Sequence, residues 1–235
     1  MNSTCVEIKV VGASNMWVTA PYFNCPQGLL DVMEKIANGA MPEPATFAAF
    51  NDLVRDELAT VVTESARQLD HIWHQRADTG CFPLASCFID DCLAKGMDFD
   101  RGGARYNWVE NSFVGLANLV DGLIAVKRLV YDSEEISIGE FRELLRNDFE
   151  GQEPLRLRIL NRLPSYGNGD AEADALAAEW AEILEDTTES HVVGLHTYVP
   201  GFFCWVMHER LGAKTGATPD GRKAGTALAD GAGAA

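Results

Sequence analysis

The sequence feature that most constrains the fold is a long stretch with helical periodicity between residues 46 and 76. It follows the helix breakers Pro42 and Pro44, and Thr46 can cap its amino end by accepting a backbone hydrogen bond. Its apolar residues recur at three- and four-residue spacings, and they are Phe47, Phe50, Leu53, Val54, Leu58, Val61 and Val62. The pattern predicts one long amphipathic helix with a buried face.

Shorter helices and a few strands are predicted around this element. The predicted helices cover residues 27–37, 86–95, 112–131, 138–147, 155–163, 171–187 and 202–211. Residues 5–24 read as strand and loop, and 192–198 is the clearest late strand. The tail 215–235 is rich in Gly, Ala, Pro and Asp and is expected to be an ordered loop or a frayed end. Short strands that alternate with helices predict an α/β fold.

Composition narrows the class of protein. The 235 residues are 47% hydrophobic, which is enough to form the core of one large domain or two small ones. The formal net charge of -16 disfavours nucleic acid or an anionic membrane as a partner. No apolar run approaches the length of a membrane span and no basic segment precedes an apolar signal core, so a cytoplasmic protein is expected.

Cysteine and histidine spacing gives little sign of a metal centre. None of the six cysteines forms a Cys-x-x-Cys pair, so reduced thiols and no structural zinc are expected. His71 and His74 lie one helical turn apart, and surface or packing roles suit them better than metal ligation. Structural or hydrogen-bonding roles are expected for His191, His196 and His208.

A reactive pair is suggested at the start of the chain by Cys5-Val6-Glu7. In an extended tripeptide the first and third side chains point to the same side, which would place a thiol beside a carboxylate. That pair suits chemistry in which sulfur removes a hydrogen atom while the carboxylate moves a proton. The alternative is a buried cysteine followed by an exposed glutamate, which is the commoner arrangement for these residue types.

Several separate segments resemble the glycyl radical enzyme family, the pyruvate formate-lyase-like superfamily. Residues 103–107 (Gly-Ala-Arg-Tyr-Asn), 115–119 (Gly-Leu-Ala-Asn-Leu) and 164–168 (Pro-Ser-Tyr-Gly-Asn) are similar to family motifs. The strongest similarity is 215–225, Thr-Gly-Ala-Thr-Pro-Asp-Gly-Arg-Lys-Ala-Gly, with Leu-Ala-Asp-Gly at 228–231. These segments occur in the family's order and cover essentially the whole chain.

The resemblance implies a fold and a division of the chain. The family fold is a ten-stranded α/β barrel made of two five-stranded half-barrels wrapped by helices. This chain is expected to be the helix-rich second half, with the thiyl-cysteine loop at 1–26, a helical and half-barrel region at 27–211 and a Gly-rich loop segment at 212–235. The first half-barrel and the glycyl radical domain are expected to be absent, which predicts exposed apolar patches and marginal stability.

The resemblance also assigns roles to residues. Cys5 is placed at the thiyl-radical cysteine, Glu7 at the general base, and Tyr22 in a segment that faces substrate in some dehydratases, with a core tyrosine as the alternative. Thr4 replaces the glycine that usually precedes the cysteine. The resemblance implies structural roles for four residues of the motif segments, Arg105, Asn107, Asp220 and Arg222.

Cys-x-Glu is similar to the dehydratase, eliminase and decarboxylase branch of the family, whereas pyruvate formate-lyase carries two adjacent cysteines. A small hydroxylated or amine-bearing substrate that loses water or amine is expected, and an arylacetate decarboxylase or a formate C-acetyltransferase-like member is the alternative within the family. Two further alternatives remain. One is a catalytically inactive paralogue or one half of a split enzyme, and the other is a hydrolase with a Cys5 nucleophile activated by His196.

The family resemblance implies no directly bound cofactor. It implies a glycyl radical on a glycine outside this chain, installed by an activating enzyme that uses S-adenosylmethionine and an iron-sulfur cluster. A homodimer and strict anaerobiosis are implied for the intact enzyme. The chain by itself is expected to be inactive and to represent a truncated sequence.

Overall fold

The computed structural model describes residues 9–15, 19–189, 192–193 and 196–234, and these residues belong to two compact units. Unit 1 comprises residues 1–23, 60–112 and 184–203, and unit 2 comprises residues 24–59, 113–183 and 204–235. Each unit is thus assembled from three separate stretches of the sequence. No helix in the described part of the chain is both long and apolar enough to cross a membrane.

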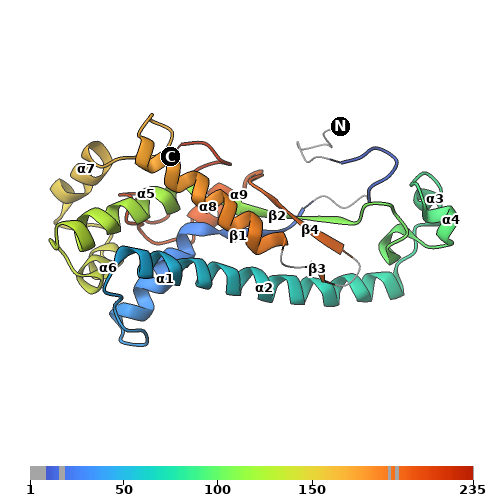
Figure 1. Cartoon of the computed structure of the whole chain (residues 1–235), viewed down its shortest axis with the longest axis horizontal. Coiled ribbons are helices and arrows are strands. Elements are labelled where there is room, and N and C mark those ends of the chain that lie inside the picture. Colours follow the sequence, from blue (N-terminus) through green and yellow to red (C-terminus); the bar gives the residue numbers. More distant parts are fainter. Residues whose placement is uncertain (1–8, 16–18, 190–191, 194–195, 235) are drawn as a thin grey trace. The chain divides into compact units, whose positions relative to one another are not determined.

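Helices make up most of the described chain (Figure 1). They are α1 (Cys25–Ala37), α2 (Phe47–Thr79), α3 (Pro83–Ser86), α4 (Cys92–Lys95), α5 (Leu116–Val126), α6 (Ile138–Arg146), α7 (Glu153–Arg162), α8 (Ala171–Glu189) and α9 (Met207–Gly212). A short 3-10 helix covers Phe99–Arg101, and a π-helical segment, Lys127–Asp132, continues α5. The long helix predicted after Pro44 is present, and the Thr46 hydroxyl accepts the hydrogen bond from the Ala49 amide that begins it.

Most residues of the sheet belong to unit 1, and its strand order is β1-β2-β4-β3. Its strands are β1 (Thr19–Asn24), β2 (Trp108–Val114), β3 (Val192–Val193) and β4 (His196–Gly201). β2 and β4 pair in parallel, from Trp108 with Thr197 to Ser112 with Gly201, whereas β3 is antiparallel to β4. A small sheet with a parallel core in a helix-rich chain confirms the predicted α/β class.

Unit 1 has an aromatic core beside this sheet. Trp73 of α2 packs with Val109 of β2 and Tyr198 of β4, and each of the three is less than a tenth exposed. The Tyr198 hydroxyl donates to the carbonyl oxygen of Ala66, 3.3 Å away. The carboxyl-terminal part of α2 is therefore held to the parallel strands by packing and by a buried hydrogen bond.

Unit 2 has a helical core in which α1 packs against α5 and α6. The Asn24 side chain caps α1 by accepting from the Gln27 amide, and Pro26 occupies the first turn, where its missing N–H costs nothing. Trp180 of α8 is 0% exposed and donates its indole N–H to the Asn51 side chain at 3.1 Å. The apolar face of α1 that the sequence predicts is thus buried.

Three predicted elements are wrong in their bounds, and left-handed backbone explains each. The predicted helix at 86–95 is interrupted because Asp91 has φ 73°, a conformation that cannot continue a right-handed helix. The predicted helix at 112–131 begins only at Leu116, because β2 occupies 108–114 and Gly115 (φ 80°) turns the chain. The predicted helix at 202–211 starts at Met207, after Trp205 with φ 48°.

The late strand predicted at 192–198 is two strands. β3 (Val192–Val193) and β4 (His196–Gly201) pair with each other, and β4 extends past the predicted end to include Pro200. Pro200 pairs with Asn111 in the register of the parallel ladder. The predicted strand therefore exists, but it continues through Pro200 and Gly201.

Candidate functional site

The proposed reactive pair, Cys5 and Glu7, lies outside the described residues. The described chain resumes a few residues later, and Tyr22, the proposed substrate contact, is a half-buried residue of β1. Tyr22 falls within one of the stretches that make up unit 1. The structure therefore shows how the segment after the reactive pair is anchored, and not the pair itself.

The anchor is a set of hydrogen bonds between residues 13–15 and the Gly-Ala-Arg-Tyr-Asn motif. The Tyr106 amide donates to the Ala13 carbonyl at 3.0 Å, and the Asn15 amide donates to the Tyr106 carbonyl at 2.9 Å. The side-chain amide of Asn15, which is 2% exposed, donates to the carbonyl oxygen of Trp108 at 3.1 Å. This motif thus fixes residues 13–15, which lie within the proposed cysteine loop and follow Cys5 and Glu7 in sequence.

Arg105 and Asn107 hold the motif itself. The Arg105 guanidinium donates to Asp91 at 2.9 Å and lies 3.4 Å from Asp90, and this ion pair lowers the pKa of the Asp91 carboxyl. The side-chain amide of Asn107 donates to the Ala104 carbonyl at 2.9 Å, and the backbone carbonyl of Asn107 accepts from the backbone amide of Thr197 in β4. Arg105 is exposed and Asn107 is half-buried, so both act as braces of a turn.

Asp220 is the buried centre of the Gly-rich loop in unit 2. Its carboxylate accepts hydrogen bonds from the Thr218 hydroxyl and from the Asn118 side-chain amide, the latter at 2.7 Å. Asn118, in turn, accepts from the Ala229 amide at 2.7 Å. Burial raises the pKa of the Asp220 carboxyl, against the opposing effect of these hydrogen bonds and of Arg222. The loop is therefore pinned to α5 through a buried chain of polar contacts.

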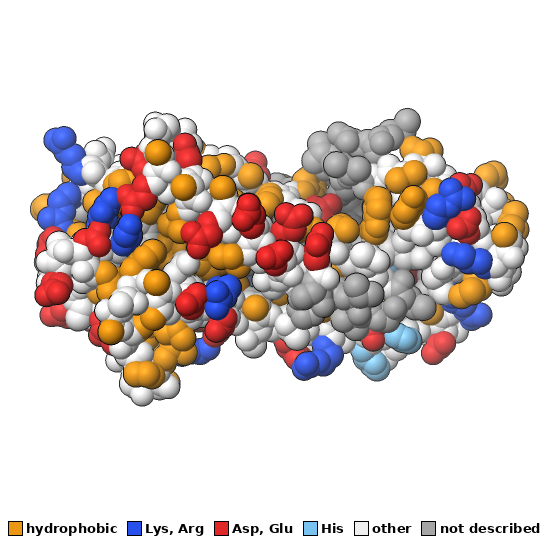
Figure 2. Space-filling model, viewed as in Figure 1, with side chains coloured by type: hydrophobic (Ala, Val, Ile, Leu, Met, Phe, Trp, Pro, Cys, Tyr) orange, Lys and Arg blue, Asp and Glu red, His pale blue; other side chains and the backbone are white. Residues whose placement is uncertain are grey.

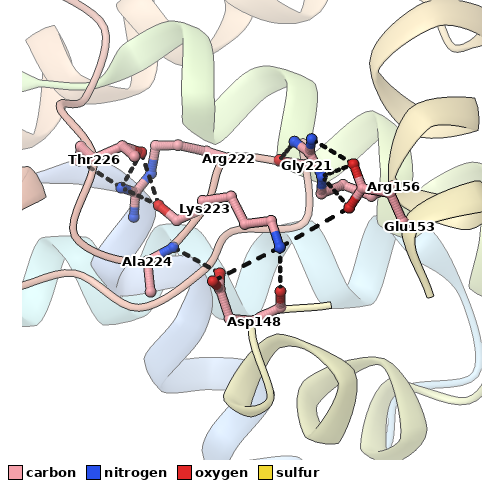
Figure 3. A network of polar contacts seen from close by, with 8 residues as sticks. All are labelled: Asp148, Glu153, Arg156, Gly221, Arg222, Lys223, Ala224 and Thr226. Atoms are coloured by element: carbon pink, nitrogen blue, oxygen red, sulfur yellow. Dashed lines mark hydrogen bonds and ion pairs between the residues drawn. The ribbon is translucent and has the colours of Figure 1, made fainter. Parts of the chain in front are cut away.

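Arg222 closes the same loop (Figure 3). Its guanidinium donates to the carbonyl oxygens of Thr215, Gly216, Lys223 and Thr226, at 3.2 Å for Thr215, 3.0 Å for Lys223 and 2.6 Å for Thr226. Five donors in a fixed plane suit this task, because they can satisfy several converging carbonyl groups at once. A lysine has one compact ammonium group and could not reproduce the arrangement.

A second set of charges ties the loop to the segment between α6 and α7 (Figure 3). Lys223 donates to the Asp148 backbone carbonyl at 2.8 Å, and the Ala224 amide donates to the Asp148 carboxylate at 2.8 Å. Arg156 of α7 pairs with Glu153 and donates to the Gly221 carbonyl at 3.0 Å. These contacts hold the loop against α7 and the residues before it.

A cavity of about 620 Å³ opens beside this loop within unit 2. Its wall includes Asp121 of α5, Asp220 and Ser165 of the Pro-Ser-Tyr-Gly-Asn turn. The Asp121 carboxylate accepts from the Tyr166 amide at 2.8 Å. Burial and the nearby carboxylate of Asp220 raise the pKa of Asp121 to about 7. Asp121 is not among the predicted site residues, although the only charged side chain of a mostly apolar helix, α5, is a signal in itself.

Replacing Asp121 by asparagine is expected to stabilise the protein at pH 8. The folded-state pKa is about 7 against an ordinary value of 3.8, so the folded state binds more protons between these values and stability falls as pH rises through that window. Asparagine can still accept from the Tyr166 amide but carries no charge. Urea unfolding should show a gain of about 2 kcal/mol at pH 8 and none at pH 4. An equal effect at both values would contradict the assignment.

Gly212 marks where the backbone of α9 approaches the Gly-rich loop. A Cβ atom at this position would lie 2.3 Å from the Thr226 carbonyl oxygen and 2.8 Å from the Leu228 nitrogen, both backbone atoms. Gly212→Ala is therefore expected to lower the free energy of unfolding by about 2–3 kcal/mol. Gly216→Ala is the matched control, because a Cβ there meets nothing within 4 Å, and it should leave the urea midpoint unchanged.

The histidines fall where structural roles were expected, as far as they are described. His71 and His74 are exposed on α2, while His191 lies outside the described residues. His196 is 2% exposed and stacks on Trp73 with ring centroids 4.6 Å apart. Burial lowers the pKa of His196 to about 4, so it is a neutral core residue at pH 7. Among the described residues, no group of His, Cys, Asp or Glu could hold a metal ion.

Comparison with known proteins gives matches over most of the chain. The Pyruvate formate lyase-like family model matches residues 1–205. The trans-4-hydroxy-L-proline dehydratase of Clostridioides difficile is 33% identical over 248 residues, covering 97% of this chain and 30% of the dehydratase. The probable dehydratase YbiW of Escherichia coli (strain K12) is 38% identical over 159 residues, covering 63% of this chain and 20% of that protein.

Solved structures extend the likeness to the fold. A structure from work on 1,2-propanediol dehydration in Roseburia inulinivorans has a TM-score of 0.89 at 30% identity, covering 96% of this chain and 30% of that chain. A glycyl radical enzyme from Archaeoglobus fulgidus has a TM-score of 0.84 at 26% identity, again over 96% of this chain and 30% of that chain. The chain spans less than a third of the length of these relatives. It belongs to the pyruvate formate lyase-like family of glycyl radical enzymes.

Proposed function

We propose that this chain is the cysteine-bearing part of a glycyl radical lyase that removes water or an amine from a small hydroxylated or amine-bearing substrate. The observation that carries the proposal is the 33% identity with trans-4-hydroxy-L-proline dehydratase over 97% of the chain, combined with Cys5 and Glu7 at the spacing typical of this branch. The fold shared with the structure from the 1,2-propanediol work supports the same reaction class.

The proposed roles of the chain's own residues follow from a balanced set of bond changes. Cys5, as a thiyl radical, takes a hydrogen atom from a substrate carbon, which forms an S–H bond. Glu7 takes the proton from the hydroxyl group on that carbon, the bond from the adjacent carbon to its leaving group breaks, and Glu7 returns the proton to the departing group. The product radical then takes the hydrogen atom back from Cys5.

In this proposal the unpaired electron on Cys5 comes from a glycyl radical outside the chain. In the complete enzyme a glycyl radical, installed by an activating enzyme that uses S-adenosylmethionine and an iron-sulfur cluster, supplies the unpaired electron that Cys5 carries. The likeness to a solved glycyl radical enzyme over 96% of the chain supports this dependence. Tyr22, on β1, is the proposed substrate contact, and the motif residues of the two loops are proposed as structural supports.

The test uses the complete polypeptide that the flanking DNA encodes, purified anaerobically together with its activating enzyme. It is expected to convert a 1,2-diol or a hydroxylated amino acid to the dehydrated product under anaerobic conditions and to lose that activity in air. Turnover by this chain in air without any companion protein would refute the proposal. Rapid alkylation of Cys5 by iodoacetamide at neutral pH would instead favour a thiolate hydrolase, because a radical-type cysteine should react as an ordinary thiol.

One alternative within the family has its own support. The indoleacetate decarboxylase of Tractidigestivibacter scatoligenes is 29% identical over 172 residues, covering 63% of this chain. An arylacetate substrate would release carbon dioxide in place of water or amine. Assaying product from both substrate classes with the same preparation separates the two reactions.

A further inference from the structure

The cavity of about 620 Å³ beside the Gly-rich loop is formed by parts of unit 2 that lie far apart in the sequence. Its wall includes residues of α5, of α7, of the turn at 163–168 and of the tail that starts at Asp220. A volume of this size lies within the range of pockets that hold small molecules. The cavity is therefore a candidate binding site in its own right.

Two carboxyl groups, those of Asp121 and Asp220, line the cavity. Asp220 is 8% exposed, and its oxygens already accept from Thr218 and Asn118. Asp121 is half-buried, and its Oδ1 accepts from the Tyr166 amide at 2.8 Å, whereas its Oδ2 accepts from no described residue. Burial and the nearby Asp220 raise the pKa of Asp121 to about 7, so its charged form is poorly compensated by the chain.

The basic residues of the wall do not supply this compensation. They are Arg156, Arg222 and Lys223. Figure 3 shows them directed at loop carbonyl oxygens and at the acidic residues of α7 and of the segment before it. None of the three lowers the pKa of Asp121. The wall thus offers negative charge that no described basic residue neutralises, which favours a cationic ligand over an anionic one.

The apolar side chains of the wall indicate which kind of cation fits. Ile159 and Leu228 are 5% and 4% exposed, and Leu160, at 47%, lies nearer the surface. A metal ion needs several oxygen or nitrogen ligands, and the described part of the chain has no cluster of His, Cys, Asp and Glu that supplies them. We propose that the cavity binds a small organic cation, a primary amine with an apolar portion, whose ammonium group donates to the Asp121 carboxylate.

The test is a calorimetric titration of the purified chain with benzylamine at pH 8, where most Asp121 carboxyl groups are ionised. Saturable binding is expected, whereas benzyl alcohol, which has the same ring and no charge, should bind at least about tenfold more weakly. Asp121→Asn keeps an acceptor for the Tyr166 amide but removes the charge, and it should weaken benzylamine binding about tenfold or more.

Two control variants are matched to the two parts of the wall. Glu179→Gln also removes one negative charge, but Glu179 lies on the exposed face of α8, where Figure 2 shows acidic side chains at the surface. It should leave the affinity unchanged. Leu160→Ala should weaken benzylamine binding about threefold or more. Leu157→Ala should not, because Leu157 is equally exposed (46%) on the same helix but does not line the cavity.

Equal binding of benzylamine by Asp121→Asn, or of benzyl alcohol by the unsubstituted chain, would overturn the proposal. An equal loss in Glu179→Gln would do so as well, because long-range charge would then be sufficient. Displacement of benzylamine by an equimolar amount of Mg²⁺ would assign the cavity to a metal ion and would also refute it.

The same titration is carried out with the complete polypeptide, and binding by this chain alone would overturn the proposal. Benzylamine binding requires no radical. Its failure would therefore leave the proposed reaction standing, whereas intact binding in a complete enzyme that turns over no substrate would contradict the reaction alone.

Discussion

Replacing Cys5 by serine in the complete enzyme is expected to reduce product formation to background. The O–H bond of serine is stronger than the S–H bond of cysteine, so an oxygen at this position would not be oxidised to the radical that removes hydrogen from the substrate. Glu7→Gln should instead lower kcat by about 10²–10⁴, the usual contribution of a positioned general base. Both variants are measured anaerobically with the activating enzyme present.

Deuterium exchange separates the two roles. In D2O, the S–H bond that Cys5 forms on hydrogen abstraction exchanges with the solvent while the substrate radical persists, so return of that hydrogen should place deuterium in recovered substrate. Glu7→Gln should retain this exchange because its cysteine is intact, whereas Cys5→Ser should lose it together with turnover. Tyr22→Phe is a useful comparison, since removing a hydroxyl that only binds substrate should raise KM more than it lowers kcat. Exchange in the Cys5→Ser enzyme would contradict the assignment of Cys5 as the hydrogen-abstracting residue.

The sequence predicted elements whose signals are local and strong. The cap at Thr46 and the apolar spacing after it locate the start of α2, and the apolar positions before Asn38 locate α1. The α/β class followed from strands alternating with helices. Each of these rests on periodicity or capping, which neighbouring residues determine largely by themselves.

The misplaced boundaries depend on backbone conformations that residue type does not reveal. Asp91 adopts φ 73° inside a run that otherwise resembles one helix, and asparagine or glycine would have been a clearer signal than aspartate. Ser112 and Phe113 continue the apolar pattern of α5 but lie in β2, since a buried strand and a buried helix look alike over a few residues. Tertiary pairing with β4 decides between them.

The anchoring residues also divide into those that a sequence motif identifies and those that only contacts in the folded chain identify. Asp220 and Arg222 stand in a recognisable motif, whereas Asn15 is singled out only by its contacts in the folded chain, among them hydrogen bonds to Tyr106 and Trp108. Asp121 was detectable as the only charged residue of α5, but its raised pKa comes first from burial in the folded chain and then from the carboxylate of Asp220, almost a hundred residues away in sequence. Contacts of this kind become visible only when the chain is folded.

Removing the carboxylate of Asp220 is expected to destabilise the chain more than the other structural substitutions considered above. Asp220→Ala leaves the Thr218 hydroxyl and the Asn118 amide without their acceptor in a buried site, and it removes the carboxylate that most favours the charged form of Arg222. Breaking a buried charge network from one side costs about 3–5 kcal/mol. Urea unfolding followed by circular dichroism at pH 7 should show a loss of that size.

Two matched variants show whether the loss comes from the buried contacts. Asp220→Asn keeps an acceptor for one donor and should lose about 1–3 kcal/mol. Asp230→Ala removes a carboxylate of the same tail whose side chain is 70% exposed and 3.7 Å from His208, so it should change stability by no more than about 0.5 kcal/mol. If Asp220→Ala were no worse than Asp230→Ala, the polar chain from Asp220 through Asn118 to Ala229 would not be what holds the Gly-rich loop on α5.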